Sequence, residues 1–302
     1  MNASVVDVNA VNNDFEFDEC RRATNDETAD FLMDEGQHKT VWMVYDRQFS
    51  DGQREICVSR SVRIDQNGGL PMPPNRTKRG ESEKREQNNE DSAKRARQSV
   101  RHRCKAISAD RMITLTYREN MQDWDRLKRD WDAFRRRMGK HKQFHYVAAI
   151  EPQERGAFHV HVAVHGRQCY QVVRRIWQNV VGRDESGREM AQANVRDPNE
   201  FFKMRSRTAK KSNRGLEHLI AGYLSKYITE DQQLHELNKK RYWSSKGVVI
   251  PEKIYYQLPY GTTEFEAFCY VMALAAAHNN KEMIMHSNSA LGCCWVATGP
   301  LH

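Results

Sequence analysis

Hydrophobic residues along the middle of the chain predict alternating strands and helices. The run 111–117, "RMITLTY", is rich in β-branched and apolar residues and predicts a strand. Apolar residues recur at helical spacing over 121–138, which predicts an amphipathic helix that Gly139 ends. Two further strands, 144–151 and 158–166, are separated by a short turn, so we expect them to pair as antiparallel neighbours.

The pattern continues with two more helices. Residues 170–182 predict a helix that stops at Gly182, and residues 215–231 predict another. The order strand, helix, strand, strand, helix is typical of an α+β domain. We therefore expect a central, largely antiparallel sheet flanked by helices.

Outside this core, the composition changes from segment to segment. The N-terminal stretch is acidic, and two β-rich runs that meet at Asp51-Gly52 predict a β-hairpin. A later stretch is crowded with charge and predicts a linker or a solvated helix. The expected division is a disordered acidic leader (1–36), a hairpin (37–70), a charged linker (71–99), the main domain (100–258), and a C-terminal helix and tail (259–302).

Charge is distributed unevenly along the chain. The formal net charge is +8, although acidic side chains outnumber basic ones ten to two within 1–35. The body is therefore strongly basic, which indicates a polyanionic partner, with a generally basic, solubilising surface as the alternative. We find neither an apolar run of about 18 residues nor a secretory signal nor a Walker motif, so we expect a cytoplasmic protein without a membrane span or motor of its own.

The segment "GAFHVHVAVHG" places three histidines on one parity of a predicted strand. His159, His161 and His165 share one face, whereas the intervening valines hold the other. Two imidazoles at i and i+2 lie close enough to bind one cation. A histidine pair of this kind is more often a polar, solvent-facing surface, so other residues have to support the metal hypothesis.

Glu151 is the first supporting residue. If the two strands pair across the turn that contains Gly156, Glu151 comes level with the histidines. Two nitrogens, one oxygen and open positions suit Mg²⁺ or Mn²⁺ acting as a Lewis acid. The alternatives are that Glu151 is a strand-end charge in solvent, or that Glu154, within the turn, supplies the carboxylate.

Two tyrosines on the last predicted helix are the second supporting feature. Tyr223 and Tyr227 are spaced i and i+4, which places both phenols on one face, and Lys226 lies beside them. That face also holds an apolar stripe that begins at Leu216, so packing in the core is a serious alternative. Near a metal-bound phosphate, a phenol is a candidate nucleophile, and Lys226 is a candidate source of positive charge or an ordinary solvated lysine.

Clustered cations predict contacts with DNA phosphates. The candidates are Arg135 and Arg136 at the end of one helix, and Lys203, Arg205, Arg207, Lys210, Lys211 and Arg214 before the tyrosine helix. Tyr242 and Trp243 lie among lysines, which predicts either a stacking platform for an unpaired base or a small packed core.

Three of these segments together resemble a known family. "MITLTYREN", "EPQERGAFHVHVAVHG" and "GYLSKYITED" look like the three motifs of the HUH endonuclease superfamily, in its rolling-circle replication initiator branch. The likeness covers residues 107–231. The tyrosine motif is similar to the two-tyrosine form of phage and plasmid initiators, and the resemblance implies a ferredoxin-like or RRM-like nuclease domain.

The resemblance implies roles for individual residues. His159, His161 and Glu151 match the metal ligands of the family, with Mg²⁺ or Mn²⁺ as the cofactor. Tyr223 matches the nucleophile that nicks single-stranded origin DNA through a 5′-phosphotyrosine, and Tyr227 matches the second tyrosine. The implied partners are origin DNA, a host helicase and a DNA polymerase.

Other functions remain as alternatives to this interpretation. A HIT-type nucleotide hydrolase would need a histidine where Ala163 stands, and a conjugative relaxase would have its tyrosine before the histidine pair. A single-tyrosine transposase shares the motif order and is the enzymatic alternative. A basic DNA-binding protein with a vestigial site is the non-enzymatic one.

Overall fold

The computed structural model describes two compact units of the chain. The described residues are 38–64, 85–153, 155–196, 216–230, 240–277 and 283–300. The first unit takes its elements from both ends of the chain, and the second is formed mainly by residues 75–251. Within the described residues, the search for a helix long and apolar enough to cross a membrane finds none.

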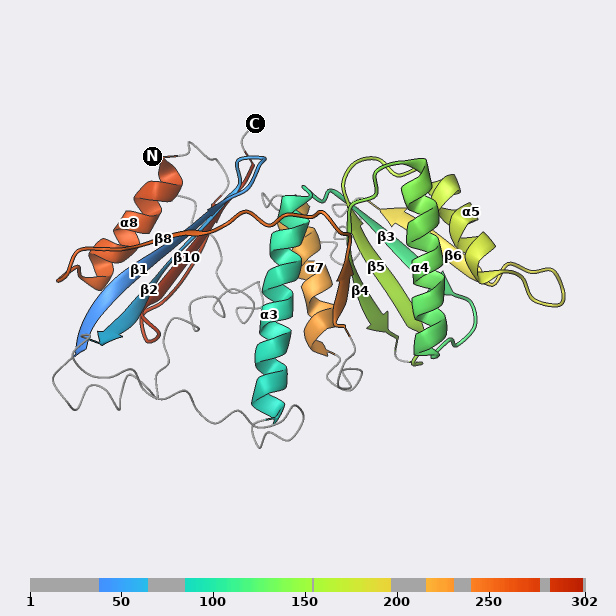
Figure 1. The fold of residues 1–302 in the computed structure, drawn as a ribbon, viewed down its shortest axis with the longest axis horizontal. Helices are drawn as coiled ribbons and strands as arrows, with labels where there is room; N and C mark the ends of the chain where they lie inside the picture. The colour runs from blue at the N-terminus through green and yellow to red at the C-terminus, as the bar shows by residue number, and fades with distance from the viewer. Residues whose placement is uncertain are drawn as a thin grey trace, which may run out of the picture. The chain divides into compact units, whose positions relative to one another are not determined.

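The first unit is a five-stranded antiparallel sheet with one helix on a face (Figure 1). Its strand order is β8-β1-β2-β10-β9. The helix α8 lies against the apolar face of β1, β2 and β10. The elements are β1 (His38–Gln48), β2 (Arg54–Ile64), β8 (Ile254–Gln257), α8 (Glu264–Ala276), β9 (Met283–Asn288) and β10 (Cys293–Thr298).

This sheet confirms the predicted hairpin and changes the picture of the C-terminal region. β1 pairs antiparallel with β2 around a turn in which Gly52 has a φ of 85°. The C-terminal helix begins after Thr263, which forms a reciprocal cap with Glu266. The tail expected after this helix contains β9 and β10 instead, and β10 is buried along its whole length because it lies inside the sheet.

The second unit is a second five-stranded antiparallel sheet, with the order β6-β3-β5-β4-β7. β5, the histidine strand, is the central strand and pairs with β3 and β4. The predicted α+β architecture with an antiparallel sheet is therefore confirmed. The elements are α3 (Arg85–Ala106), β3 (Arg111–Tyr117), α4 (Trp124–His141), β4 (Tyr146–Pro152), β5 (Phe158–Val164), α5 (Tyr170–Val181), β6 (Ala191–Arg196), α7 (Leu216–Glu230) and β7 (Tyr242–Ser244).

Helices cover both faces of this sheet (Figure 1). Trp131 and Phe134 of α4 and Trp177 of α5 pack on one face, together with the valines of β5. On the other face, α3 and α7 pack over Ala149 and Ala163. Because side chains alternate along a strand, this second face is also the face of the two histidines.

One predicted helix end is confirmed and another is wrong. Helix α5 stops at Gly182, whose φ of 90° ends the helix. Helix α4 instead runs through Gly139 to His141. Gly139 lies exposed in the last turn, where its backbone stays helical, so a glycine there weakens the helix without ending it.

Helix α3 covers part of the segment expected as a charged linker. It buries a narrow stripe of small side chains, including Ala96, Val100 and Cys104, against the second unit's sheet. The stripe is flanked by charged residues, so the average composition of the segment hides it. The second unit thus begins earlier than the boundary expected at residue 100.

A glycine turn joins β4 to β5. The Gly156 amide donates to the Gln153 carbonyl at 2.7 Å, and Gly156 has a φ of 85°. A Cβ atom at this position would lie 2.5 Å from Gln122 Nε2, which donates to the Arg155 carbonyl. Backbone conformation and close packing therefore both require glycine here.

We expect Gly156→Ala to lower the free energy of unfolding of the second unit by about 1–2 kcal/mol, the cost of a left-handed L-residue. Gly139→Ala is the matched control, because its helical, open position should make the protein slightly more stable. Urea unfolding followed by tryptophan fluorescence measures both changes. Equal stability of Gly156→Ala and the wild type would contradict the assignment.

Candidate functional site

Strand pairing brings three side chains with metal-ligand chemistry together. Glu151 of β4 lies directly opposite His159 of β5, and His161 follows two residues later on the same face. One ligand atom from each of the three residues lies within 4.8 Å of the others. The expectation that Glu151 comes level with the histidines is confirmed, and Glu154 lies outside the described residues.

His161 is held on both sides of its ring. Its Nε2 lies 2.6 Å from Glu151 Oε2, and its Nδ1 lies 3.2 Å from Thr114 Oγ1 on β3. The His161 side chain is only 5% exposed, whereas the Glu151 side chain is 29% exposed. The carboxylate therefore borders solvent, and the imidazole is fixed behind it.

His159 has a different environment. Its Nε2 is buried and finds no hydrogen-bond partner among the described residues. Burial, followed by the neighbouring His161, lowers the pKa of His159 to about 4. His159 is therefore neutral at pH 7, the form in which an imidazole nitrogen binds a metal.

These three residues fit a divalent metal ion. The orphaned nitrogen of His159 is a buried polar atom that a metal would satisfy, and His161 and Glu151 supply a second nitrogen and an oxygen beside it. A set of three protein ligands leaves further coordination positions for water or a phosphate oxygen.

Tyr223 lies against this triad. Its ring packs edge-to-face on His161, with 5.5 Å between the ring centroids and an angle of 85° between the planes. Helix α7 packs on the sheet through a buried stripe that includes Ile220 and Leu224, and Tyr223 lies half-buried at the edge of that stripe. The phenol thus belongs partly to the core and partly to the surroundings of the triad.

The other two residues of the tyrosine motif are less closely defined. Lys226 is half-buried, three residues after Tyr223, and so lies on the same side of α7. The backbone of Tyr227 lies in the same helix, one turn after Tyr223, but its side chain lies outside the described part of the structure.

The predicted DNA-contacting cations fall into two groups. Arg135 and Arg136 lie on α4, where both bond to Asp132, and α4 covers the face of the sheet opposite the triad. Any DNA contact by these two arginines therefore lies away from the triad. The other group lies outside the described residues and comprises Lys203, Arg205, Arg207, Lys210, Lys211 and Arg214.

Tyr242 and Trp243 both take part in packing. The Trp243 ring stacks on Trp131, with 5.3 Å between centroids and an angle of 11° between planes. Tyr242 points to the other face of β7, where its hydroxyl lies 2.7 Å from Ser99 Oγ of α3. These positions favour the packed-core interpretation over a stacking platform for a base.

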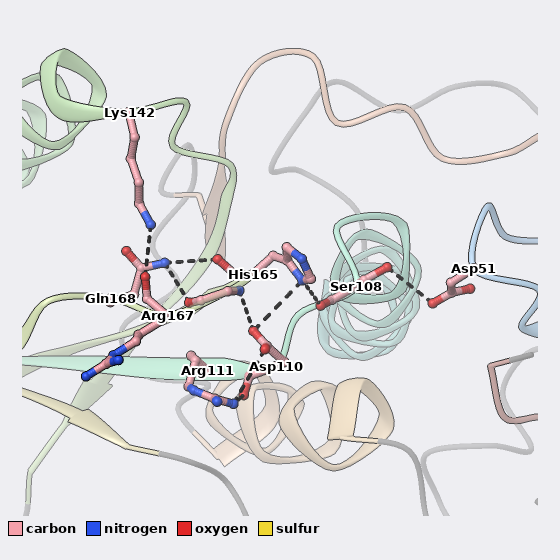
Figure 2. Close-up of polar contacts among 9 residues, drawn as sticks. Asp51, Ser108, Asp110, Arg111, Lys142, His165, Arg167 and Gln168 are labelled. Atoms are coloured by element: carbon pink, nitrogen blue, oxygen red, sulfur yellow. Dashed lines mark hydrogen bonds and ion pairs between the residues drawn. The ribbon is translucent and has the colours of Figure 1, made fainter. Parts of the chain in front are cut away.

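His165 belongs to a separate polar network (Figure 2). Its Nδ1 lies 2.7 Å from the Ser108 carbonyl oxygen, and its side chain is 63% exposed. The Asp110 carboxylate accepts from the Gly166 amide in the same network. His165 follows β5 at the end away from Glu151, so it helps to join two loops.

Sequence reasoning missed Thr114. This threonine lies in the strand expected to be structural, and its β-register with His161 places the two side chains next to each other. The pairing of β3 with β5 joins distant parts of the chain, so no local pattern indicates it. The only signal is that "ITLT" alternates apolar residues with threonines, which gives that strand one polar face.

Comparison with known families supports the location of the site. Residues 110–232 match the family model of the ORF2-type replication-associated proteins, and the match includes all three motifs. No curated protein and no solved structure matches the chain. The chain therefore carries, within its second unit, a domain of the ORF2-type replication-associated protein family, which agrees with its resemblance to rolling-circle initiators.

Proposed function

We propose that this protein initiates rolling-circle replication by nicking single-stranded origin DNA through a phosphotyrosine intermediate. The observation that carries the proposal is the packing of the Tyr223 ring on His161, itself one of three clustered metal-ligand residues. This places a nucleophilic side chain beside a site suited to a divalent ion. The match to a replication-associated family supports the initiator role over transposition.

In the proposed reaction, the Tyr223 oxygen attacks the phosphorus of a DNA phosphodiester. The new bond joins the tyrosine to the 5′-phosphate, the bond from phosphorus to the 3′-oxygen breaks, and the phenolic proton passes to solvent. A bound Mg²⁺ or Mn²⁺ would supply Lewis-acid polarisation of the phosphate. His159, His161 and Glu151 hold that ion, and Lys226 offsets the developing negative charge.

The free 3′-hydroxyl produced by nicking serves two purposes in this proposal. It primes a host DNA polymerase while a host helicase unwinds the strand, and at the end of the cycle a 3′-hydroxyl attacks the phosphotyrosine to rejoin the DNA. Tyr227, one helical turn from Tyr223, is the proposed second nucleophile for that exchange. The cations between residues 203 and 214 precede the tyrosine helix and are proposed to bind the DNA backbone.

Tyr223→Phe should abolish or strongly reduce covalent capture of DNA, because it removes the attacking oxygen and keeps the ring. The measurement uses single-stranded oligonucleotides that tile the encoding element and scores denaturant-resistant adducts. Tyr170→Phe, at an exposed tyrosine of α5, should leave capture unchanged. Capture at the wild-type level by the double variant Tyr223→Phe/Tyr227→Phe would refute tyrosine catalysis.

His159→Gln should weaken Mn²⁺ binding at least about ten-fold, because it removes one of three ligands. Titration of the free ion by electron paramagnetic resonance measures the affinity directly. His165→Gln is the control: it also removes an imidazole, but from the separate loop network. A variant at residue 159 that binds Mn²⁺ as tightly as the wild type would sink the metal assignment.

A further inference from the structure

The Thr114 hydroxyl contacts the His161 ring nitrogen that faces away from Glu151. Thr114 lies on β3 directly opposite His161, and its Oγ1 is 3.2 Å from His161 Nδ1. The other ring nitrogen, Nε2, lies 2.6 Å from Glu151 Oε2. A hydroxyl and a carboxylate therefore hold the imidazole from opposite sides.

These contacts require one tautomer of a neutral His161 in the absence of metal. An ionised carboxylate only accepts hydrogen bonds, so contact with Glu151 places the imidazole proton on Nε2. Nδ1 then has no proton and accepts a hydrogen bond from the Thr114 hydroxyl. The direction of this hydrogen bond is from threonine to histidine.

Metal binding requires the other tautomer. An ion held by Nε2 needs the lone pair of that nitrogen, so the proton of a neutral imidazole has to lie on Nδ1. Nδ1–H then donates to Thr114 Oγ1. A hydroxyl suits both states because it can rotate to donate or accept, whereas a carbonyl only accepts and a methyl group does neither.

We propose that Thr114 is a positioning residue for the metal site, whose hydrogen bond to His161 reverses direction when His161 exchanges Glu151 for a metal ion. The proton moves from Nε2 to Nδ1 through solvent, so the net charge of the imidazole does not change. This inference rests on the metal site of the proposed function, and it is independent of the tyrosine chemistry.

Thr116 provides an internal comparison. It lies on the same strand and face, directly opposite His159, and among the described residues its hydroxyl makes no hydrogen bond to that histidine. A threonine beside a histidine is therefore not by itself the feature. The contact between Thr114 and His161 distinguishes the two positions.

Mn²⁺ titration of variants at residue 114 tests the role of the hydroxyl. Thr114→Val should weaken Mn²⁺ binding about 10–100-fold, the usual effect of losing a group that orients a ligand. Thr114→Ser should restore most of the affinity, and Thr116→Val should leave it unchanged. Unchanged affinity of Thr114→Val would overturn the inference, while normal wild-type binding would leave the metal site itself intact.

A second measurement uses the wild-type protein and so does not depend on the folding of a variant. Nitrogen-15 NMR of labelled histidines distinguishes a ring protonated at Nε2 from one protonated at Nδ1. Addition of Mg²⁺ should shift His161 from the first form to the second. A His161 that remains protonated at Nε2 at saturating Mg²⁺ would overturn the reversal, and a protein that binds neither ion would overturn the metal site together with the inference.

Discussion

Backbone hydrogen bonds between β4 and β5 set the register that places Glu151 opposite His159. A slip of one residue would move the carboxylate to the α4 face of the sheet, because side chains alternate along a strand. Gly156 stabilises that register through a turn that other residues accommodate poorly. The candidate metal centre is thus a consequence of one antiparallel strand pair and its connection.

The rest of the second unit adds to this strand pair in layers. α4 and α5 bury the apolar face of the sheet, which leaves the histidine face to α3 and α7. Small side chains at Ala149 and Ala163 are part of the core beneath these two helices, and packing of α7 there brings Tyr223 against His161. The same layer buries His159, which keeps its imidazole neutral.

Local patterns in the sequence predict much of the second unit and little of the first. Strand alternation and a short connection were sufficient to predict that Glu151 joins the histidines, since neighbouring strands with a short turn pair as an antiparallel hairpin. The partners of β3 and β10 depend on contacts between distant parts of the chain, so neither Thr114 nor the C-terminal strands could be assigned. Helix α3 was missed because its buried stripe consists of small residues in a highly charged segment.

Chain connectivity separates the family-matched domain from the other unit. The sequence forms β1 and β2, builds the second unit, and returns to complete the first sheet with β8, β9 and β10. The family match, residues 110–232, lies entirely within the second unit. The first unit is therefore an addition to the replication-associated domain, with its own core under α8.

Crystals grown with Mn²⁺ and measured at the manganese absorption edge test the central claim most directly. We expect one anomalous peak within bonding distance of His159 Nε2, His161 Nε2 and a Glu151 carboxylate oxygen. A second unit with the same strand register but no manganese at this position, or manganese bound elsewhere, would contradict the metal centre.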